Sequence, residues 1–424
     1  MLLIKNAKII NADKITKQIK DILIEKDKIV KIDSSIDFDN KNIKIIDAEG
    51  KYVLPGLIDM HVHLREPGEE HKETIETGMK AAARGGFTTI LCMPNTNPTL
   101  DNANVISSVL KEAARVGTIN VLPVGAITKA RKGKELSDML ELKEAGCIAI
   151  SDDGTGLMNA QIMRLALEYA NMAGLLIMQH CQDSQLSRLS VMNEGKISTL
   201  LGLKGDPGMS ETVMVSRDIE LANYLNVPVY FQHVSLKRSV ELIKFAKQKG
   251  IKVFAEVTPH HLSLTEEDLI SFDTKYKVNP PLRTKEDVKA LRKAIINGDI
   301  DCIATDHAPH SIEDKEKDFN QAAFGMIGLE TALGIIVKEL VSQQGFDWTS
   351  LVSRMSAKPA EILGMDNKGK IKEGCDADLI IVDVEKKWIV DEKDFESKSK
   401  NSPFIGKELQ GKVLKTVCGG KVVY

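Results

Sequence analysis

Short apolar segments alternate with amphipathic ones along the middle of the chain, and this alternation constrains the fold most. The apolar segments are GLIDMHVH (56–63), FTTILCMPN (87–95), INVLPVGAIT (119–128), CIAISDDG (147–154), LLIMQHC (175–181), VPVYFQHVS (227–235), IKVFAEVTPHH (251–261) and DCIATDHAPH (301–310). Most of the stretches between them have apolar residues at three- and four-residue spacing and a glycine near the end, as helices do. Strand followed by helix, repeated about eight times, predicts parallel strands closed into a (β/α)8 TIM barrel.

Both ends of the chain carry short β-like runs separated by polar turns, such as LLIKNAKII near the start and GKVLKTVCGGKVVY at the end. Their spacing predicts small antiparallel strands. We therefore expect one small β domain built from both termini, residues 1–53 and 367–424, around a barrel at 54–366.

The composition is that of a soluble globular chain, with 43% hydrophobic and 28% charged residues and a formal net charge of -3. This balance argues against a nucleic-acid or membrane surface and favours a small-molecule partner. The N-terminus has no long apolar core of a signal peptide. The six cysteines are scattered and contain no CxxC pair. They are expected to be buried free thiols in a cytoplasmic protein.

Polar residues stand at the C-terminal ends of the apolar segments, where a barrel has its active-site face. Six of them are metal-ligating types: His61, His63, Asp153, His180, His233 and Asp306. His61 and His63 are two apart on one strand, so both rings can face the barrel axis. Neutral imidazole and carboxylate suit Zn²⁺, and the sequence predicts a zinc site at this face.

The aspartate pair at 152–153 leaves one choice open. Large aliphatic residues commonly face the helix ring, and Ile148 and Ile150 share a face with Asp152. Asp153 is therefore expected to point inward, and Asp152 to tether the loop that follows. A cysteine nucleophile is disfavoured, because Cys181 and the adjacent His180 point to opposite faces of a strand. No GxSxG elbow occurs in the barrel segments.

Two motifs carry a resemblance to a known family over nearly the whole chain. They are DMHVHLREP at 59–67 and ATDHAPH at 304–310 followed by Lys315, with PNTNP at 94–98 as a third segment. This set resembles the amidohydrolase superfamily and, within it, the long-chain bacterial dihydroorotases.

The resemblance implies two zinc ions per subunit. His61 and His63 would bind one ion with Asp306 nearby, and His180 and His233 the other. Asp153 would stand where many members of the superfamily carry a carbamylated lysine that bridges the ions.

The same resemblance implies reversible hydrolysis of dihydroorotate to N-carbamoyl-L-aspartate, a step of pyrimidine biosynthesis. Asp306 would move the proton. The residues implied in substrate binding are His63, Arg65, Asn95, Asn279, His310 and the backbone of Phe324 and Gly325. A homodimer and an association with aspartate transcarbamoylase also follow from the resemblance alone.

Two other functions are weighed against this one. A related cyclic amidase (dihydropyrimidinase, hydantoinase or allantoinase) would share the fold and the metals, but its substrates lack the carboxylate that Arg65 and Asn95 would hold. A non-catalytic, dihydroorotase-like scaffold for aspartate transcarbamoylase would be expected to have lost metal ligands, and all six positions are present.

Several residues also have an interpretation outside the chemistry. Arg65 could form a surface ion pair, and Asn279, which precedes two prolines, could be a turn residue. His260 and His261 are expected to shape the site or fill the core, and His307 to be structural or to support a site residue from behind. Residues 311–325 are a candidate lid. The lysine-rich run EKDFESKSKNS at 392–402 is expected to be a solvated loop.

Overall fold

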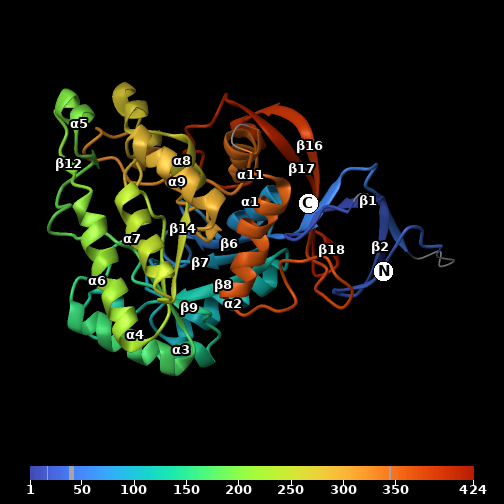
Figure 1. The fold of residues 1–424 in the computed structure, drawn as a ribbon, viewed down its shortest axis with the longest axis horizontal. Coiled ribbons are helices and arrows are strands. Elements are labelled where there is room, and N and C mark those ends of the chain that lie inside the picture. Colours follow the sequence, from blue (N-terminus) through green and yellow to red (C-terminus); the bar gives the residue numbers. More distant parts are fainter. Residues whose placement is uncertain (17, 38–42, 343–344) are drawn as a thin grey trace.

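The computed structural model describes residues 1–16, 18–37, 43–342 and 345–424. Eight parallel strands form the central sheet, each bonded to the next in chain order (Figure 1). They are β6 (Leu57–Val62), β7 (Phe87–Cys92), β8 (Asn120–Gly125), β9 (Ala149–Ile150), β10 (Leu176–Gln179), β13 (Val229–Phe231), β14 (Val253–Val257) and β15 (Cys302–Ile303). A parallel bridge between Val62 and His307 joins the last strand to the first, so the barrel is closed.

A helix follows each barrel strand and covers its outer face. They are α1 (Ile75–Gly85), α2 (Ala103–Val116), α3 (Met139–Glu144), α4 (Ala160–Ala173), α6 (Met209–Leu225), α7 (Lys237–Gln248), α9 (Lys285–Asn297) and α11 (Ala332–Ile336). The end of α4 shows how the sequence sets these boundaries. Asn159 caps its first turn through the side chain, and Gly174 ends it at φ 65, a left-handed conformation that glycine adopts without strain. The (β/α)8 barrel predicted from the sequence is confirmed.

Apolar side chains form two layers on either side of the barrel wall. The inner layer fills the barrel and contains Met60, Leu91, Val124, Met178, Tyr230 and Cys302. The outer layer lies between strands and helices. Because the interior is packed, polar side chains can collect only where the strands end, and that rim positions the site.

Strands from both termini form a second sheet in the order β18–β17–β16–β5–β1–β2–β3, with β4 also paired to β1. Its strands are β1 (Leu2–Ile9), β2 (Lys20–Glu25), β3 (Lys28–Asp33), β4 (Lys44–Asp47), β5 (Tyr52–Pro55), β16 (Leu379–Ile389), β17 (Glu408–Cys418) and β18 (Lys421–Val422). Most pairs in this sheet are antiparallel, as the spacing predicted, but β1 pairs in parallel with both β4 and β5. The domain boundaries at 53 and 366 stay predictions.

The β16–β17 hairpin connects this sheet to the barrel. Thr416 Oγ1 donates to the carbonyl of Ala83 in α1 at 2.6 Å, and Gly334 in α11 lies so close to Leu409 that a Cβ would approach within 3.0 Å. In Figure 1 both long strands arch beside α1 and α11. The segment that joins β16 to β17 is thereby held near the barrel rim.

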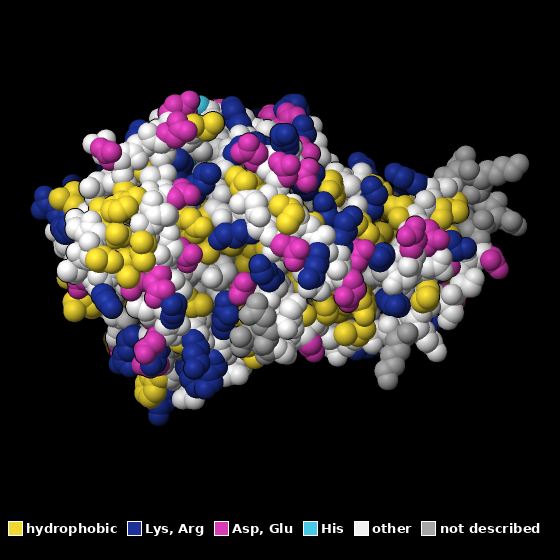
Figure 2. Space-filling view, turned by 90° about the horizontal axis from the view of Figure 1, so that it is seen from above, with side chains coloured by type: hydrophobic (Ala, Val, Ile, Leu, Met, Phe, Trp, Pro, Cys, Tyr) yellow, Lys and Arg dark blue, Asp and Glu magenta, His cyan; other side chains and the backbone are white. Residues whose placement is uncertain are grey.

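The surface shows no bias toward one charge on the face seen in Figure 2, where the described basic and acidic side chains are interspersed. All six cysteines are free and buried. Among the described residues, every helix is too short or too polar to cross a membrane.

Candidate metal centre and active site

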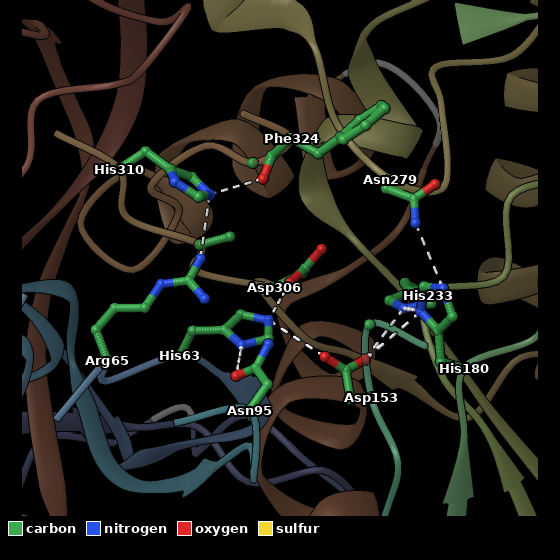
Figure 3. A pocket seen from close by; sticks show the side chains of 13 residues that line it. His63, Arg65, Asn95, Asp153, His180, His233, Asn279, Asp306, His310 and Phe324 are labelled. Carbon is green, nitrogen blue, oxygen red and sulfur yellow. Dashed lines mark hydrogen bonds and ion pairs between the residues drawn. The ribbon is translucent and has the colours of Figure 1, made fainter. Parts of the chain in front are cut away.

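A cavity of ≈ 260 Å³ lies at the rim formed by the strand ends (Figure 3). It is lined by His63, Arg65, Asn95, Asp153, Gly154, His180, His233, Asn279, Asp306, Ala308, His310, Phe324 and Gly325. His61 lies beneath it and is 0% exposed. The structure thus brings together all the residues that the sequence analysis named for metal and substrate.

The backbone is left-handed at three of these residues, with φ values of 62° at Arg65, 32° at His233 and 47° at Asp306. Such conformations are unfavourable for residues with a side chain and persist where the surroundings fix them. Each of the three follows a barrel strand closely. The local bend turns their side chains into the cavity instead of continuing the strand.

Asp153 lies at the centre of the cluster. Its Oδ1 is 3.3 Å from His61 Nε2 and 3.6 Å from both His180 Nδ1 and His233 Nε2. Its Oδ2 is 3.6 Å from His63 Nε2. One carboxylate therefore faces all four histidines, as a group that bridges two ligand sets must.

Glu256 in β14 determines which nitrogen His61 offers to the cavity. Its Oε1 lies 2.8 Å from His61 Nδ1, which must carry the proton to donate to a carboxylate. His61 Nε2 is then unprotonated, and it is buried without a hydrogen-bond partner among the described residues. It faces oxygens of Asp153 and, at 3.6 Å, of Asp306. Acceptors that face one another in this way favour a proton or a metal cation between them.

His63 is oriented in the same manner by Asn95. His63 Nδ1 donates to Asn95 Oδ1 at 2.9 Å, which leaves Nε2 to face Asp306 Oδ1 at 3.0 Å. Because Asn95 uses its oxygen on His63, its amide nitrogen is the atom that it can offer to a ligand in the cavity. Asn95 thus orients a predicted metal ligand and also lines the cavity.

His180 and His233 form the other side of the cluster. His180 Nδ1 is 2.8 Å from His233 Nε2, and the rings pack edge to face with centroids 4.7 Å apart. The backbone N–H of His233 donates to Glu256 at 3.1 Å. Glu256 therefore bonds His61, which is predicted to bind one ion, and His233, which is predicted to bind the other.

The pKa values show how strongly the cluster favours a cation. Burial alone would raise the pKa of Asp153, but His61, His180 and His233 outweigh it and hold this pKa well below its usual range. Burial would likewise lower the pKa of His61, yet Asp153, Asp306 and Glu256 raise it well above the ordinary value. A positive charge among these groups is therefore strongly stabilised.

The donor set fits a divalent metal such as zinc. Two groups have ligand atoms within 4.8 Å of one another, His61 with Asp153 and His233, and His61 with His63 and Asp306. His180 belongs to neither group but contacts Asp153 and His233. Imidazole nitrogen and carboxylate oxygen are ordinary zinc ligands, and Glu256 supplies the outer carboxylate that usually orients a ligating histidine.

Arg65 and His310 form one wall of the cavity, to which Arg65 brings a positive charge. Arg65 is 7% exposed, its Nε donates to Pro309 O at 3.1 Å, and within the described chain no carboxylate pairs with it. His310 Nε2 lies 2.8 Å from Phe324 O and 3.2 Å from Arg65 Nη2. Since only a protonated Nε2 can donate to the carbonyl, the Arg65 approach is a packing contact. Burial and the charge of Arg65 lower the pKa of His310 to about 2, so its ring is neutral.

Asn279 lies opposite this wall and pairs with Gln182 through two amide hydrogen bonds of 2.8 and 2.9 Å. Phe324 contributes its backbone, whereas its ring points away from the cavity in Figure 3 and covers Lys277 Nζ at 4.4 Å from the centroid. Both polar backbone atoms of Gly325 are used within the protein, because its N–H donates to Lys277 O and its C=O accepts from Lys315 and Asn401.

Other residues considered in the sequence lie outside the cavity lining. Asp152 binds Thr128, in the loop after β8, through Thr128 N at 3.0 Å, so the expected tether to the following loop was wrong for its side chain. His261 bonds Thr258 and Pro280 O. His307 donates to Glu73 at 3.2 Å and is fully buried. These contacts are structural.

In the run at 392–402, residues 392–394 are exposed, but the expected solvated loop was wrong for the rest. Phe395, Ser397, Ser399 and Asn401 are buried, and this segment bonds to residues of the barrel rim. From Phe395 to Asn401, buried side chains alternate with more exposed ones, so only one side of this part of the run faces solvent.

Two supporting residues were missed by the sequence analysis. Glu256 stands within the apolar run IKVFAEVTPHH. A lone carboxylate there was a usable signal, because a buried charge requires partners. Gln182, which holds Asn279, follows a strand end and carries no comparable signal.

Comparisons with known proteins agree with this geometry. Residues 50–239 match the Dihydro-orotase-like family, and residues 244–424 match the Amidohydrolase family. A protein named dihydroorotase from Pelotomaculum thermopropionicum is 49% identical over 424 residues, covering 100% of this chain and 98% of that protein. Another, from Acetivibrio thermocellus, is 48% identical over 422 residues, covering 100% and 98%.

Solved structures with this fold include hydantoinases. The L-hydantoinase (dihydropyrimidinase) from Arthrobacter aurescens superimposes with a TM-score of 0.87 at 27% identity, covering 99% of this chain and 95% of that one. The dihydropyrimidinase from Brevibacillus agri gives 0.83 at 25% identity, covering 99% and 94%. The fold is therefore kept in proteins in which only about a quarter of the residues are identical.

Proposed function

Because the chain belongs to the dihydroorotase family of the amidohydrolase superfamily, we propose that this hydrolase opens and closes the ring of dihydroorotate at the cavity described above. Hydrolysis of one ring amide gives N-carbamoyl-L-aspartate, and ring closure is the reverse, in pyrimidine biosynthesis. The observation that carries the proposal is the buried Arg65 guanidinium, which faces the cavity beside a metal-type cluster without a carboxylate partner among the described residues.

We propose that two zinc ions are held by His61, His63, Asp153, His180, His233 and Asp306. A bound Zn²⁺ lowers the pKa of water toward about 7 and polarises a carbonyl oxygen. Asp153 would join the two ligand sets, because its two oxygens face different histidines. Glu256 and Asn95 hold the rings of His61 and His63 so that each presents Nε2.

Asp306 would move the proton in both directions. Burial would raise its pKa, but His61 and His63 hold it below the usual range, so the carboxylate is ionised and can accept. It would take the proton of the attacking water and deliver it to the leaving ring nitrogen. In ring closure it would deprotonate the ureido nitrogen.

Arg65 would hold the substrate carboxylate through two parallel hydrogen bonds, a geometry that a guanidinium favours. The Asn95 amide nitrogen would assist, and neutral His310 would complete this wall. Asn279 and the backbone at Phe324 would contact the ureide edge. Gly325 would let the substrate approach its backbone closely. It would not bond the substrate, because its own polar backbone atoms are already bonded within the protein.

A related cyclic amidase is the second candidate, favoured by the structural likeness to hydantoinases. Two observations favour dihydroorotate instead. Aspartate stands at position 153, where those amidases usually carry a lysine, and Arg65 has its buried charge unpaired. The test is a panel of dihydroorotate, dihydrouracil, hydantoin and allantoin with the zinc-loaded protein. Turnover of dihydroorotate alone is expected, and turnover of dihydrouracil or allantoin without dihydroorotate would refute the proposal.

From the family we also expect a cytoplasmic location and a homodimer. Sedimentation of the purified protein tests the homodimer. An association with aspartate transcarbamoylase stays a prediction.

A further inference from the structure

The segment 395–402, here called the strap, crosses from the β16–β17 hairpin to the barrel rim. Its side chains alternate: Phe395, Ser397, Ser399 and Asn401 are buried, whereas Glu396 and Lys398 are exposed. Ser399 Oγ donates to Lys72 O at 2.6 Å, and Lys398 N donates to Glu73 at 3.0 Å. The strap is therefore fixed to the loop after β6, and its last buried side chain, Asn401, reaches the back of the cavity wall.

Asn401 is 5% exposed, and every polar atom of its amide is bonded. Its Nδ2 donates to Ala308 O and Gly325 O, both at 3.1 Å, and its Oδ1 accepts from His310 N at 3.2 Å. Its backbone carbonyl accepts from Ile327 N at 3.2 Å. A single side chain thus joins two segments of the wall, 308–310 and 323–325.

These two segments need such a link at the cavity. The backbone N–H of Ala308 donates to Met326 O, next to the second segment, at 2.9 Å. Toward the cavity they approach so closely that a Cβ on Gly325 would lie 2.8 Å from Ala308 O and 3.1 Å from the His310 ring. The His310 ring joins them directly through Phe324 O, and among the described side chains from outside the two segments only the Asn401 amide bonds to both.

The same segments fix the anion-binding groups. Pro309 O, between the two residues that Asn401 holds, accepts from Arg65 Nε at 3.1 Å. Phe324 O, next to the carbonyl that Asn401 holds, orients the His310 ring at 2.8 Å. A shift of either segment would therefore displace Arg65, His310 or both, without touching the metal-type cluster.

We propose that Asn401 is a positioning residue that sets the carboxylate-binding wall through Arg65 and His310, so that the strap makes substrate affinity depend on the small β region. This inference rests on the proposed function. Loss of the amide leaves the Ala308 carbonyl and the His310 N–H without partners in a buried place, where unpaired groups are unfavourable, and removes one of the two bonds to Gly325 O. The wall relaxes to satisfy them, and the guanidinium moves away from the position that holds the carboxylate.

The test compares three variants by kcat and KM for dihydroorotate, with zinc content and melting temperature. Asn401→Ala removes the amide. Asn401→Asp keeps the shape and the acceptor for His310 N but places an oxygen against two carbonyls. Lys398→Ala is the matched control, because this exposed strap residue bonds only Glu70 O through its side chain. Both Asn401 variants are expected to raise KM about tenfold with kcat within about threefold, from the loss of buried hydrogen bonds. The control should change neither.

A double-mutant cycle separates positioning from a general loss of structure. If Asn401 acts through the guanidinium, Asn401→Ala should lower kcat/KM about tenfold in the wild-type background but less than about threefold beside Arg65→Ala. The inference would be overturned if the two effects multiplied in the double variant. It would also be overturned if the Asn401 variants had an unchanged KM, or if their kcat fell together with their zinc content. Turnover of dihydroorotate by the wild type tests the proposed function separately, since the inference is judged only from ratios to that rate.

Discussion

Glu256 lies directly beneath His61, and its Oε1 accepts from Nδ1 of that ring at 2.8 Å. The contact fixes the tautomer, so the only nitrogen that His61 can present to the cavity is Nε2. Tyr230 holds the other carboxylate oxygen at 2.8 Å. A residue outside the cavity thus determines which nitrogen a predicted metal ligand presents to it.

Glu256→Gln is therefore expected to weaken zinc binding about 10- to 100-fold, the usual effect of losing an outer carboxylate partner. The charge that favours a cation is lost, and the ring is less firmly oriented. Competition with a chromogenic chelator measures the zinc Kd. Tyr230→Phe, which removes only the hydroxyl bond to Oε2, is the control and should have a smaller effect. An unchanged zinc Kd in Glu256→Gln would show that His61 is not oriented by this carboxylate.

Asp306→Asn should reduce kcat by about 10²–10⁴, the usual contribution of general acid–base catalysis. The amide keeps the shape of the side chain but cannot accept and return a proton. The measurement is steady-state kinetics of the zinc-loaded protein, with metal content and circular dichroism alongside. Near-normal kcat with normal zinc content would remove Asp306 from the proton transfer.

Arg65→Lys should raise KM for dihydroorotate roughly 10-fold or more, because an ammonium group cannot form the paired bonds of a guanidinium. The effect on kcat should be smaller, since Arg65 faces the carboxylate and not the reacting bond. Arg164→Lys, at an exposed position of α4, is the matched control. If the Arg65 variant binds substrate as tightly as the wild type, the carboxylate is held elsewhere.

The convergence of the site could be predicted from the sequence, because a barrel forces the C-terminal ends of its strands to one rim. His61 and His63 two positions apart, and Asp306 at the last strand, needed no knowledge of loop paths. The strap could not be found in this way. Asn401 lies 91 positions from His310, and nothing in its neighbourhood indicates which surface the loop crosses.

The terminal sheet shows a second limit. Alternating runs predict strands but do not fix partners, and short polar turns suggested hairpins throughout. Leu2 instead pairs with Lys44, and Ile9 with Val53, both in parallel. Pairing between strands separated by other strands depends on the packing of the whole sheet, which local turn chemistry does not encode.

Glu330 provides a test of the strap by pH. Its carboxylate accepts from the backbone N–H of Glu396 at 2.8 Å and of Ser397 at 3.3 Å. Burial, only partly offset by these bonds and by Arg84, raises its pKa from 4.5 to about 7. The folded protein therefore binds this proton more tightly than the unfolded chain does. The stabilisation is complete below pH 4.5 and is lost as pH rises toward and through 7.

Glu330→Gln, which stays neutral, should lack this dependence. The difference in the free energy of unfolding, variant minus wild type, should therefore rise by up to roughly 3 kcal/mol between pH 4.5 and pH 8, as the shift in pKa requires. Urea denaturation at several pH values measures the difference. Glu144→Gln, at the exposed end of α3, corrects for general effects of charge removal. A Glu330→Gln difference that stayed constant with pH would mean that the carboxylate keeps an ordinary pKa and that the strap is held without a buried proton.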